Sequence, residues 1–587
     1  MIFTSHFLQS VPEILHDSVA RWWERAGREG VLPGIYAALP GALQAELPRL
    51  VAASEFVASA LIQDPQGLGW VSRHLEPSIA RAANREYHRR VCAAATTADA
   101  QRLLREWRRR EMLRIAWRDI AGRAGVVDTL HAVSELADAC IGAATAAAQA
   151  ILENPFGRAR SAAGADVPLI VLGMGKLGGM ELNFSSDVDL VFLFAQAGQT
   201  DGTRVIENEE YFTRVGRELI RLLDARTENG FAFRVDMRLR PFGESGPLTV
   251  SLASLEDYLQ QHGRDWERYA WIKARAIVGA EAYGAVNQEF VRPFVYRRYL
   301  DFGVFESLRE MKALIAREVA RRDLGQDLKL GSGGIREIEF IVQSMQLVRG
   351  GSDRRLQNAA LLEVLPRLVD SKSLSAAEVA GLHDAYLVLR KAENAVQMIR
   401  DEQTHSIPLD PADRARLSLN MGAADWSTAS ERIDAARRAV ARQFEALLFG
   451  SPDTKRANGE APLSWLGIEA SSIEEELAGG GFPAHEIRAV AALLETYRKS
   501  APYRRLDEAG RRRLHIVLDR LLKAAAGQGH PAIVVQRVLR VFDAIGARSS
   551  YLALLKEQPA ALDRLIDVCA ISGFLARQIA DFPLLLD

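Results

Sequence analysis

Two aspartates, Asp187 and Asp189, stand one residue apart at the start of an apolar run that continues to Phe194. A run of this composition predicts a buried strand. Because side chains on a strand alternate between its two faces, residues two apart point the same way and both carboxylates can contact shared divalent ions. In phosphoryl and nucleotidyl transfer, metal ions that orient the reacting groups supply much of the catalysis. The pattern therefore predicts a metal-dependent nucleotidyl transfer site.

Asp236 offers a third carboxylate. It lies in residues 231–239, where apolar residues alternate with charged ones, and this alternation predicts a half-buried strand. One predicted helix separates it from the first two aspartates, so a neighbouring strand could bring all three together as catalytic metal ligands. We expect Arg238 and Arg240 on the same face to neutralise phosphate charge. A simple ion pair between Asp236 and an arginine is the alternative.

A glycine-rich turn at residues 173–179 precedes the aspartates. We expect Gly178 and Gly179 to let backbone amides approach phosphate oxygens closely, since glycine has no side chain to block them. Ser186 can donate its hydroxyl beside the metal pair, and Lys176 can bind phosphate or nucleotide charge. A tight turn without any ligand is the structural alternative.

Two other phosphate-binding patterns fit this turn less well. Residues 173–178 match GxGxxG after a predicted strand, as in dinucleotide-binding units. Only nine residues separate Gly178 from Val188, however, which is too few for a crossover helix and its turn. A P-loop needs GxxxxGK[ST], whereas Lys176 precedes the second glycine pair and is followed by leucine.

The bulk composition limits the class of protein. A length of 587 residues with 48% hydrophobic residues is enough for about four domains. The 74 basic and 75 acidic residues give a net charge of −1, so we expect no nucleic acid partner. The three cysteines lack disulfide or zinc spacing. No leader or long uncharged apolar segment is evident, so we expect a cytoplasmic protein that does not bind membrane.

The elements that must position the aspartates follow from periodicity. Residues 1–150 have apolar residues at helical spacing, strands are expected at 167–172, 188–194 and 231–239, and a helix at 207–226. This predicts an α+β, mostly helical fold. The expected divisions are an N-terminal helical region at 1–150, a catalytic core at 151–300, a helical domain at 301–450, an exposed linker at 451–462 and a helical bundle at 463–587.

Five segments together carry a family resemblance. They are GKLGGMELNFSSDVDL ending at Leu190, VDMRLRP ending at Pro241, WERYAWIKAR ending at Arg275, GGIREIEFIVQ ending at Gln343, and QTHSIP ending at Pro408. The chain resembles the glutamine synthetase adenylyltransferase/adenylyl-removing enzymes, and the resemblance extends over nearly its whole length. That family contains two nucleotidyltransferase domains of the DNA polymerase beta superfamily.

The resemblance implies a DNA polymerase beta-like nucleotidyltransferase core flanked by helical domains. In this family the motif Glu-Leu-Asn-Phe-Ser-Ser before the aspartates is typical of the N-terminal, adenylyl-removing copy. No second glycine-rich turn with Asp-x-Asp follows it in this sequence. The implied reaction is phosphorolysis of adenylyl-tyrosine on glutamine synthetase, with Mg²⁺ or Mn²⁺, phosphate and adenine nucleotide, under control of a PII nitrogen-signalling protein. An ATP-dependent adenylyltransferase and a catalytically silent binding fragment are the alternatives.

Five further residues in these segments have charged or titratable side chains. Lys273 and Arg275 could bind nucleotide charge or be structural. Glu337 and Glu339 are two apart on a predicted helix, so they diverge by about 200 degrees and we expect hydrogen-bonding roles rather than a second metal centre. His405 has no ligand cluster at metal spacing nearby, and we expect a structural role.

Overall fold

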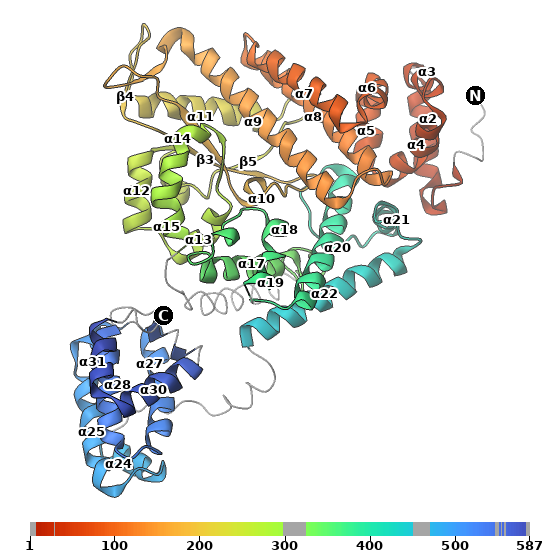
Figure 1. Ribbon diagram of the computed structural model, residues 1–587. Helices are drawn as coiled ribbons and strands as arrows, with labels where there is room; N and C mark the ends of the chain where they lie inside the picture. The colour runs from red at the N-terminus through yellow and green to blue at the C-terminus, as the bar shows by residue number, and fades with distance from the viewer. Residues whose placement is uncertain are drawn as a thin grey trace. The chain divides into compact units, whose positions relative to one another are not determined.

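The computed structural model describes residues 8–28, 30–296, 324–371, 373–449, 470–506, 508–545, 551–552, 555–556 and 559–582. The chain divides into two compact units (Figure 1). The first contains Met1–Val295, Leu314–Met345 and Arg355–Phe444, and the second contains Tyr296–Ala313, Gln346–Arg354 and Glu445–Asp587. The expected linker at 451–462 lies outside the described residues, and so do residues 301–323. The predicted domain boundaries stay predictions.

The N-terminal part of the first unit is helical, as the periodicity predicts. Its helices are η1 (Glu13–Leu15), α2 (His16–Arg28), α3 (Val31–Ala37), α4 (Gly41–Ala53), α5 (Glu55–Gln63), α6 (Gln66–His74), α7 (Pro77–Cys92), α8 (Thr97–Ile120) and α9 (Val126–Phe156). Ser54 and Thr96 begin α5 and α8 by accepting hydrogen bonds from backbone N–H groups of the first turn. Helix α9 has the length and hydropathy of a membrane span, but half of the window that gives this hydropathy is buried, and α9 packs against α7, α8 and α11.

The sheet that carries the aspartates follows α9. Strands β2 (Leu169–Gly173), β3 (Val188–Phe194), β5 (Val235–Asp236), β6 (Thr249–Ser251) and β7 (Arg275–Val278) form it in the order β5-β3-β2-β7. Strand β2 runs antiparallel to both β3 and β7. Two short strands, β5 and then β6, pair in parallel with successive parts of β3. Strands β1 (Ala159–Ser161) and β4 (Gly198–Thr200) form a separate two-stranded sheet.

The predicted long strand at residues 231–239 is wrong in its extent. Strand β5 contains only Val235 and Asp236, and the chain then turns. The Asp236 carboxylate accepts a hydrogen bond from the backbone N–H of Arg238 at 2.8 Å, which supports this turn. A side-chain bond of this kind competes with strand pairing, and the alternating pattern does not reveal it. The predicted helix at 207–226 is confirmed as α11 (Asn208–Asp224).

Helices complete the first unit around the sheet. Helix α10 (Gly175–Gly178) follows β2 directly. The later helices are α12 (Leu252–Gln261), α13 (Asp265–Ile272), α14 (Ala280–Val286), α15 (Arg292–Val295), α17 (Ile335–Arg349), α18 (Leu361–Val364), α19 (Arg367–Asp370), α20 (Ala376–Arg400), α21 (Pro411–Asn420) and α22 (Trp426–Phe449). The last residues of α17 and α22, from Gln346 and from Glu445, belong to the second unit. Short helical turns η2 (Gly243–Ser245), η3 (Asn287–Val291), η4 (Leu324–Gln326) and η5 (Arg354–Leu356) lie between them.

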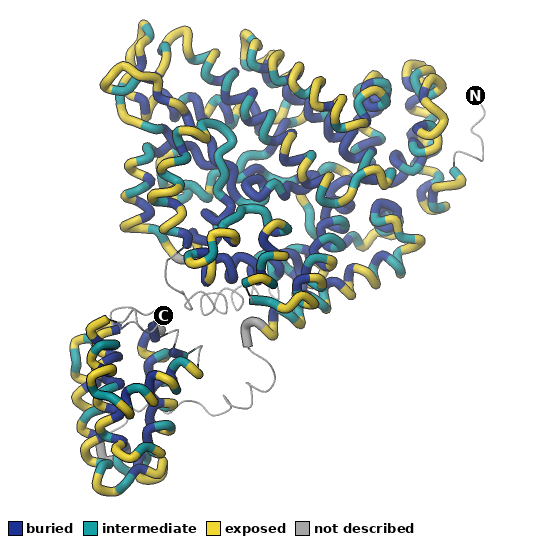
Figure 2. The backbone as a smooth tube through the Cα atoms, viewed as in Figure 1, coloured by how far each residue is buried: buried dark blue, intermediate teal, exposed yellow. Residues whose placement is uncertain are grey.

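One hydrophobic core joins the N-terminal helices to the sheet. Trp107 of α8, Phe192 of β3, Leu219 of α11 and Met398 of α20 all belong to this cluster and are fully buried. Figure 2 shows the buried residues following the inner sides of these helices and the strands. Because burial of this apolar surface stabilises all of these elements together, the sheet edge with the aspartates is fixed by helices from distant parts of the sequence.

The described part of the second unit is helical and has its own core. It contains α24 (Ala470–Gly479), α25 (Ala484–Arg498), α26 (Ala501–Arg505), α27 (Glu508–Ala525), α28 (Pro531–Ile545), α30 (Pro559–Ile571) and α31 (Gly573–Asp581). Leu494, Leu518, Phe542 and Leu565 pack in a cluster separate from that of the first unit. The fold class is therefore α+β and mostly helical, as predicted.

Candidate active site

The three predicted carboxylates lie at one end of the sheet. Asp189 of β3 is directly opposite Asp236 of β5 in the parallel register, and Asp187 precedes β3 by one residue. The carbonyl of Asp189 accepts the N–H of Met174, so the glycine-rich turn and β3 are joined beside the carboxylates. The structure thus brings the three aspartates to neighbouring positions, although it does not test which of them is catalytic.

The electrostatic environment differs among the three carboxylates. Burial raises the pKa of Asp189 to about 6, and the negative charges of Asp236 and Asp187 add to this rise. Burial also opposes ionisation of Asp236, but hydrogen bonds and charge from Arg238 outweigh it, so the pKa of Asp236 is lowered. A buried carboxylate with like charges beside it favours a nearby cation.

The donor set fits a divalent metal by chemistry, although its ligands are not assembled. Carboxylate oxygens are the ligands that Mg²⁺ and Mn²⁺ prefer. Across the residues that the structure describes, no three histidine, cysteine or acidic side chains converge at metal-ligand spacing. Asp187 instead accepts hydrogen bonds from Arg234 at 2.7 Å and Gln403 at 2.8 Å, and Asp236 is paired with Arg238. Metal binding would require these two carboxylates to turn from their present partners.

The glycine next to the carboxylates is not one of the two predicted. A Cβ on Gly175 would lie 2.6 Å from Asp189 Oδ2, and Gly175 has a φ of +51°. Gly178 instead packs on backbone, because its Cβ would lie 1.6 Å from the carbonyl oxygen of Lys273. A Cβ on Gly179 would lie 3.0 Å from the carbonyl oxygen of Ala359. Close protein packing therefore accounts for Gly178 and Gly179, and Gly175 is the glycine beside the carboxylates.

The predicted phosphate-binding cations already have protein partners. Lys176 is only partly exposed and pairs with Glu393 at 2.9 Å, and removal of its ammonium from water lowers its pKa to about 8. The guanidinium of Arg238 pairs with Asp236, although its side chain is 70% exposed. The guanidinium of Arg240 donates to the carbonyls of residues 237, 244 and 246, which fixes the turn after β5. Of the three, only Arg238 is exposed enough to reach a ligand by moving its side chain.

The hydroxyl predicted beside the metals belongs to a half-buried residue. Ser186 precedes Asp187 directly and is of intermediate exposure. Its neighbour Ser185 is fully buried and has several partners: its hydroxyl and its carbonyl both accept hydrogen bonds from Arg234. Arg234 thus ties the segment before the first aspartate to the segment before β5.

Lys273 and Arg275 both make contacts within the protein. Lys273 is buried and pairs with Glu181 at 2.6 Å, and Glu339 lies 3.7 Å away. Arg275 makes two parallel hydrogen bonds to Asp138 at 2.8 and 2.9 Å. These contacts favour the structural interpretation of both side chains.

The two glutamates of α17 diverge as predicted. Glu337 accepts a hydrogen bond from the backbone N–H of Gly333 at 3.0 Å, at the start of the helix. Glu339 faces Lys273. Burial alone would raise the pKa of Glu339, but the charges of Lys273 and other nearby cations outweigh burial and lower it. They take different partners on different sides of the helix and form no shared site.

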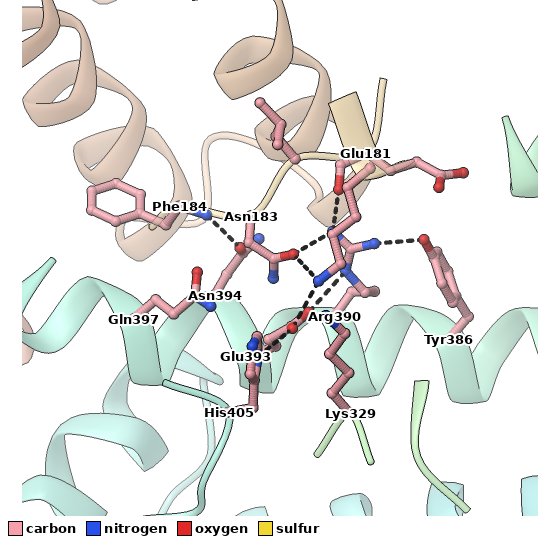
Figure 3. Close-up of polar contacts among 12 residues, drawn as sticks. Glu181, Asn183, Phe184, Lys329, Tyr386, Arg390, Glu393, Asn394, Gln397 and His405 are labelled. Carbon is pink, nitrogen blue, oxygen red and sulfur yellow. Dashed lines mark hydrogen bonds and ion pairs between the residues drawn. The ribbon is translucent and has the colours of Figure 1, made fainter. Parts of the chain in front are cut away.

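Helix α20 holds the loop that leads into the first aspartate. The side-chain oxygen of Asn394 accepts the N–H of Phe184 at 3.0 Å (Figure 3). The side-chain oxygen of Gln397 accepts the N–H of Ser185 at 2.8 Å. All four residues are buried. A buried N–H without a partner is costly, so these bonds fix where the chain enters Asp187.

Two charged residues of α20 extend this network. Arg390 donates to the carbonyl of Glu181 and to the side chain of Asn183 (Figure 3). Glu393 pairs with Lys176. Arg390 and Glu393 are fully buried. Since buried charges are tolerated only when paired, the network ties the glycine-rich turn, the loop and the helix together.

His405 belongs to the same network, in agreement with its predicted structural role. Its Nδ1 lies 2.7 Å from Glu393 Oε1, and its carbonyl accepts the N–H of Leu328 at 2.8 Å. The polar residues of α20 were not selected from the sequence. A signal was present, because Arg390, Glu393, Asn394 and Gln397 recur at steps of three, one and three and so share one helix face.

Comparison with known proteins gives a family context for this geometry. Residues 44–290, which include all three aspartates, match the family model described as glutamate-ammonia ligase adenylyltransferase. Residues 309–448, which include α20, match the model described as GlnD PII-uridylyltransferase.

Curated relatives match over more than nine tenths of the chain. The bifunctional glutamine synthetase adenylyltransferase/adenylyl-removing enzyme of Thioalkalivibrio sulfidiphilus is 43% identical over 557 residues, covering 92% of this chain and 57% of the relative. The enzymes of the same name from Stenotrophomonas maltophilia and Pseudomonas aeruginosa are each 42% identical, over 94% and 92% of this chain and 58% and 56% of their own length. The chain is a homologue of these bifunctional enzymes. The predicted resemblance is thereby confirmed.

The chain spans somewhat more than half the length of these bifunctional enzymes. Its relatives are nucleotidyltransferases by name, and that class agrees with aspartates at one end of a sheet. The homology does not determine which of the two named activities this chain carries.

Proposed function

We propose that the chain removes adenylyl groups from glutamine synthetase by metal-dependent phosphorolysis. The observation that carries this proposal is the in-register pair Asp189 and Asp236, with Asp187 beside it, in a homologue of enzymes named for adenylyl removal. The proposal includes a DNA polymerase beta-like core, a cytoplasmic location and a role in controlling nitrogen assimilation. It favours the adenylyl-removing activity because Glu-Leu-Asn-Phe-Ser-Ser precedes the aspartates.

In the proposed reaction, an oxygen of inorganic phosphate attacks the phosphorus of the adenylyl group. The bond between that phosphorus and the tyrosine oxygen breaks, which gives ADP and the tyrosine side chain. The leaving phenolate is the base of an acid with a pKa of about 10, so it leaves more readily than an alkoxide and takes up a proton.

The chain's own residues have distinct roles in this proposal. Asp187, Asp189 and Asp236 would hold Mg²⁺ or Mn²⁺, which when bound would polarise the transferred phosphoryl group. Arg238, the exposed cation at the site, would contact phosphate charge. Gly175 would allow the Asp189 carboxylate to lie close against the glycine-rich turn, because a side chain there would meet Asp189 Oδ2. Lys176 would position the loop before Asp187 through its bonds to Asn183 and Glu393.

A second candidate is the reverse type of transfer, in which ATP adenylylates the same tyrosine. The family model matched by residues 44–290 is named for adenylyltransfer, and this observation favours the candidate. The same carboxylates would serve, because both reactions occur at an adenylyl phosphorus.

Regulation by a PII nitrogen-signalling protein is a further part of the proposal. Residues 309–448 match a family model named for PII uridylylation, which supports contact with PII. Binding of purified PII to the chain, measured by calorimetry, tests this part separately.

One assay distinguishes the candidate activities. The purified chain is incubated with adenylylated glutamine synthetase, Mg²⁺ and phosphate, and the released nucleotide is identified. We expect ADP from phosphorolysis; AMP would indicate hydrolysis, and no nucleotide would refute the proposal. Transfer of labelled AMP from ATP to unmodified glutamine synthetase would support the second candidate. Asp189→Asn should reduce ADP release by on the order of 100-fold or more, while the exposed Asp166→Asn should have no effect.

A further inference from the structure

The cations around the three aspartates are almost all paired within the protein. In the part of the chain that the structure describes, these pairs are Lys176 with Glu393, Arg234 with Asp187, Arg238 with Asp236, Arg240 with backbone carbonyls, Lys273 with Glu181, and Arg275 with Asp138. Apart from Arg238, whose side chain is 70% exposed, these paired cations offer little free positive charge to a phosphate group.

Lys329 differs from these residues. Its ammonium makes no hydrogen bond or ion pair with any described residue, and its side chain is only half-buried. It is nevertheless close to the site, because the adjacent Leu328 bonds to the carbonyl of His405 and Gln403 of the same segment donates to Asp187 at 2.8 Å. Figure 3 shows its side chain extending from a separate loop toward Arg390 and Glu393.

The backbone that carries Lys329 is held in place. The carboxylate of Asp327 accepts the N–H groups of Lys329 at 2.8 Å and Leu330 at 2.7 Å, forming a tight turn. Leu328 donates its N–H to the carbonyl of His405 at 2.8 Å, and Asp327 forms an isolated bridge with Ser406. The turn from which the Lys329 side chain extends is thus joined to the segment after α20.

We propose that Lys329 contacts a phosphoryl oxygen of the reacting groups. This inference rests on the proposed function, and it adds a residue that the sequence motifs did not indicate. A lysine ammonium is a compact charge with three donors, and charge-assisted bonds to phosphate oxygens are strong. The oxygen can belong to the attacking inorganic phosphate or to the adenylyl group, and the kinetic constants distinguish these two sources.

Lys329→Met tests the inference in the full chain. ADP release is measured against the concentrations of inorganic phosphate and of adenylylated glutamine synthetase. Loss of one charge-assisted hydrogen bond should raise the KM for phosphate, or lower kcat, by about 10- to 100-fold. A change confined to the phosphate KM assigns the contact to the attacking phosphate; a lower kcat with both KM values unchanged assigns it to the adenylyl phosphoryl in the transition state. Unchanged constants would overturn the inference.

Two further variants control for charge and for structure. Lys329→Arg keeps the charge and should retain more activity than Lys329→Met. A purely structural role of Lys329 does not predict this difference. Lys499→Met removes an exposed lysine of the second unit and should leave all constants unchanged. Circular dichroism of each variant checks that the fold is intact.

A binding measurement separates this inference from the proposed function. Equilibrium dialysis with radiolabelled inorganic phosphate and Mg²⁺ needs no turnover. Wild-type chain that releases no nucleotide would refute the proposed function, while weaker phosphate binding by Lys329→Met would still support the contact. The inference would be refuted if KM and kcat are unchanged in Lys329→Met and, in addition, the wild type binds no phosphate or the variant binds it equally well.

Discussion

Asp189 carries its negative charge in a half-buried position near two other carboxylates. Burial and the charges of Asp236 and Asp187 raise its pKa from an ordinary value of 3.8 to about 6. The unfolded chain exposes this carboxyl to water, so ionisation is easier there than in the folded state. In the absence of metal, the ionised Asp189 therefore costs stability, which agrees with a position prepared for a cation.

The pH dependence of this cost follows from its sign. Because the folded pKa lies above the unfolded one, the cost is absent below pH 3.8, grows between the two pKa values, and is complete above pH 6. We expect metal-free Asp189→Asn to be more stable than wild type at pH 7.5 by roughly 2–3 kcal/mol, and this difference to shrink toward zero near pH 4. Urea unfolding of both proteins in EDTA measures it. A difference that is constant with pH would contradict the assigned burial of the charge.

Gly178 provides a test of packing at a single residue. Its added methyl group would meet the carbonyl of Lys273, where backbone cannot yield easily. We expect Gly178→Ala to destabilise the chain by about 3 kcal/mol or more. Gly284→Ala in α14 has open space around its Cβ and should be neutral or stabilise by up to about 1 kcal/mol. Thermal unfolding compares the two, and equal effects would show that Gly178 is not closely packed.

At the scale of elements, α20 and the loop before Asp187 act as one assembly. Three side chains of the helix accept or donate hydrogen bonds to the loop, and a fourth pairs with Lys176 of the preceding turn. The loop has few backbone bonds of its own, so the helix decides its course. Among these helix residues, Gln397 bonds the loop residue nearest to the aspartates along the chain, because its partner Ser185 lies two residues before Asp187.

Gln397→Ala should lower kcat strongly while lowering the free energy of unfolding only moderately. It leaves the buried N–H of Ser185 without a partner, at a cost of about 1–3 kcal/mol. A loop shift of about 1 Å at Asp187 could lower kcat by on the order of 100-fold. Gln443→Ala is the matched control, because Gln443 bonds the carbonyl of Glu378 within the same unit but far along the chain from the aspartates. Comparison of kcat with the free energy of unfolding for both variants checks the role; equal kcat values would exclude it.

At the scale of the whole molecule, the two units have separate hydrophobic cores. One cluster of buried residues in the first unit runs from residue 11 to residue 419, and the cluster in the second unit runs from residue 473 to residue 580. The predicted catalytic residues and α20 all belong to the first unit.

A shortened chain that ends at residue 449 should fold and keep the proposed activity. Calorimetry of the full chain should show two unfolding transitions, because two cores that share no buried residues can unfold independently. The transition that is absent from the shortened chain is then assigned to the second unit. A shortened chain that fails to fold, or one cooperative transition in the full chain, would contradict this independence.

Much of the fold and part of the site could be predicted from the sequence. Strand β3, helix α11 and the N-terminal helices have clear periodicity, and the spacing of Asp187 and Asp189 places both at the start of β3. Periodicity did not reveal that Asp236 bends the chain after two strand residues, because a local side-chain bond decides this. It also did not show that Lys176 and Gly178 face protein rather than open space.

The sequence by itself determined the local elements, the three carboxylates and the family, because these depend on short-range spacing and on motifs. Only the tertiary structure decided which charges are already neutralised. Lys176, Lys273 and Arg275 look equally available in sequence, yet each has a partner that lies far from it along the chain. The free energy of a buried charge depends on its neighbours in space, and those neighbours are set only when distant helices pack on the sheet.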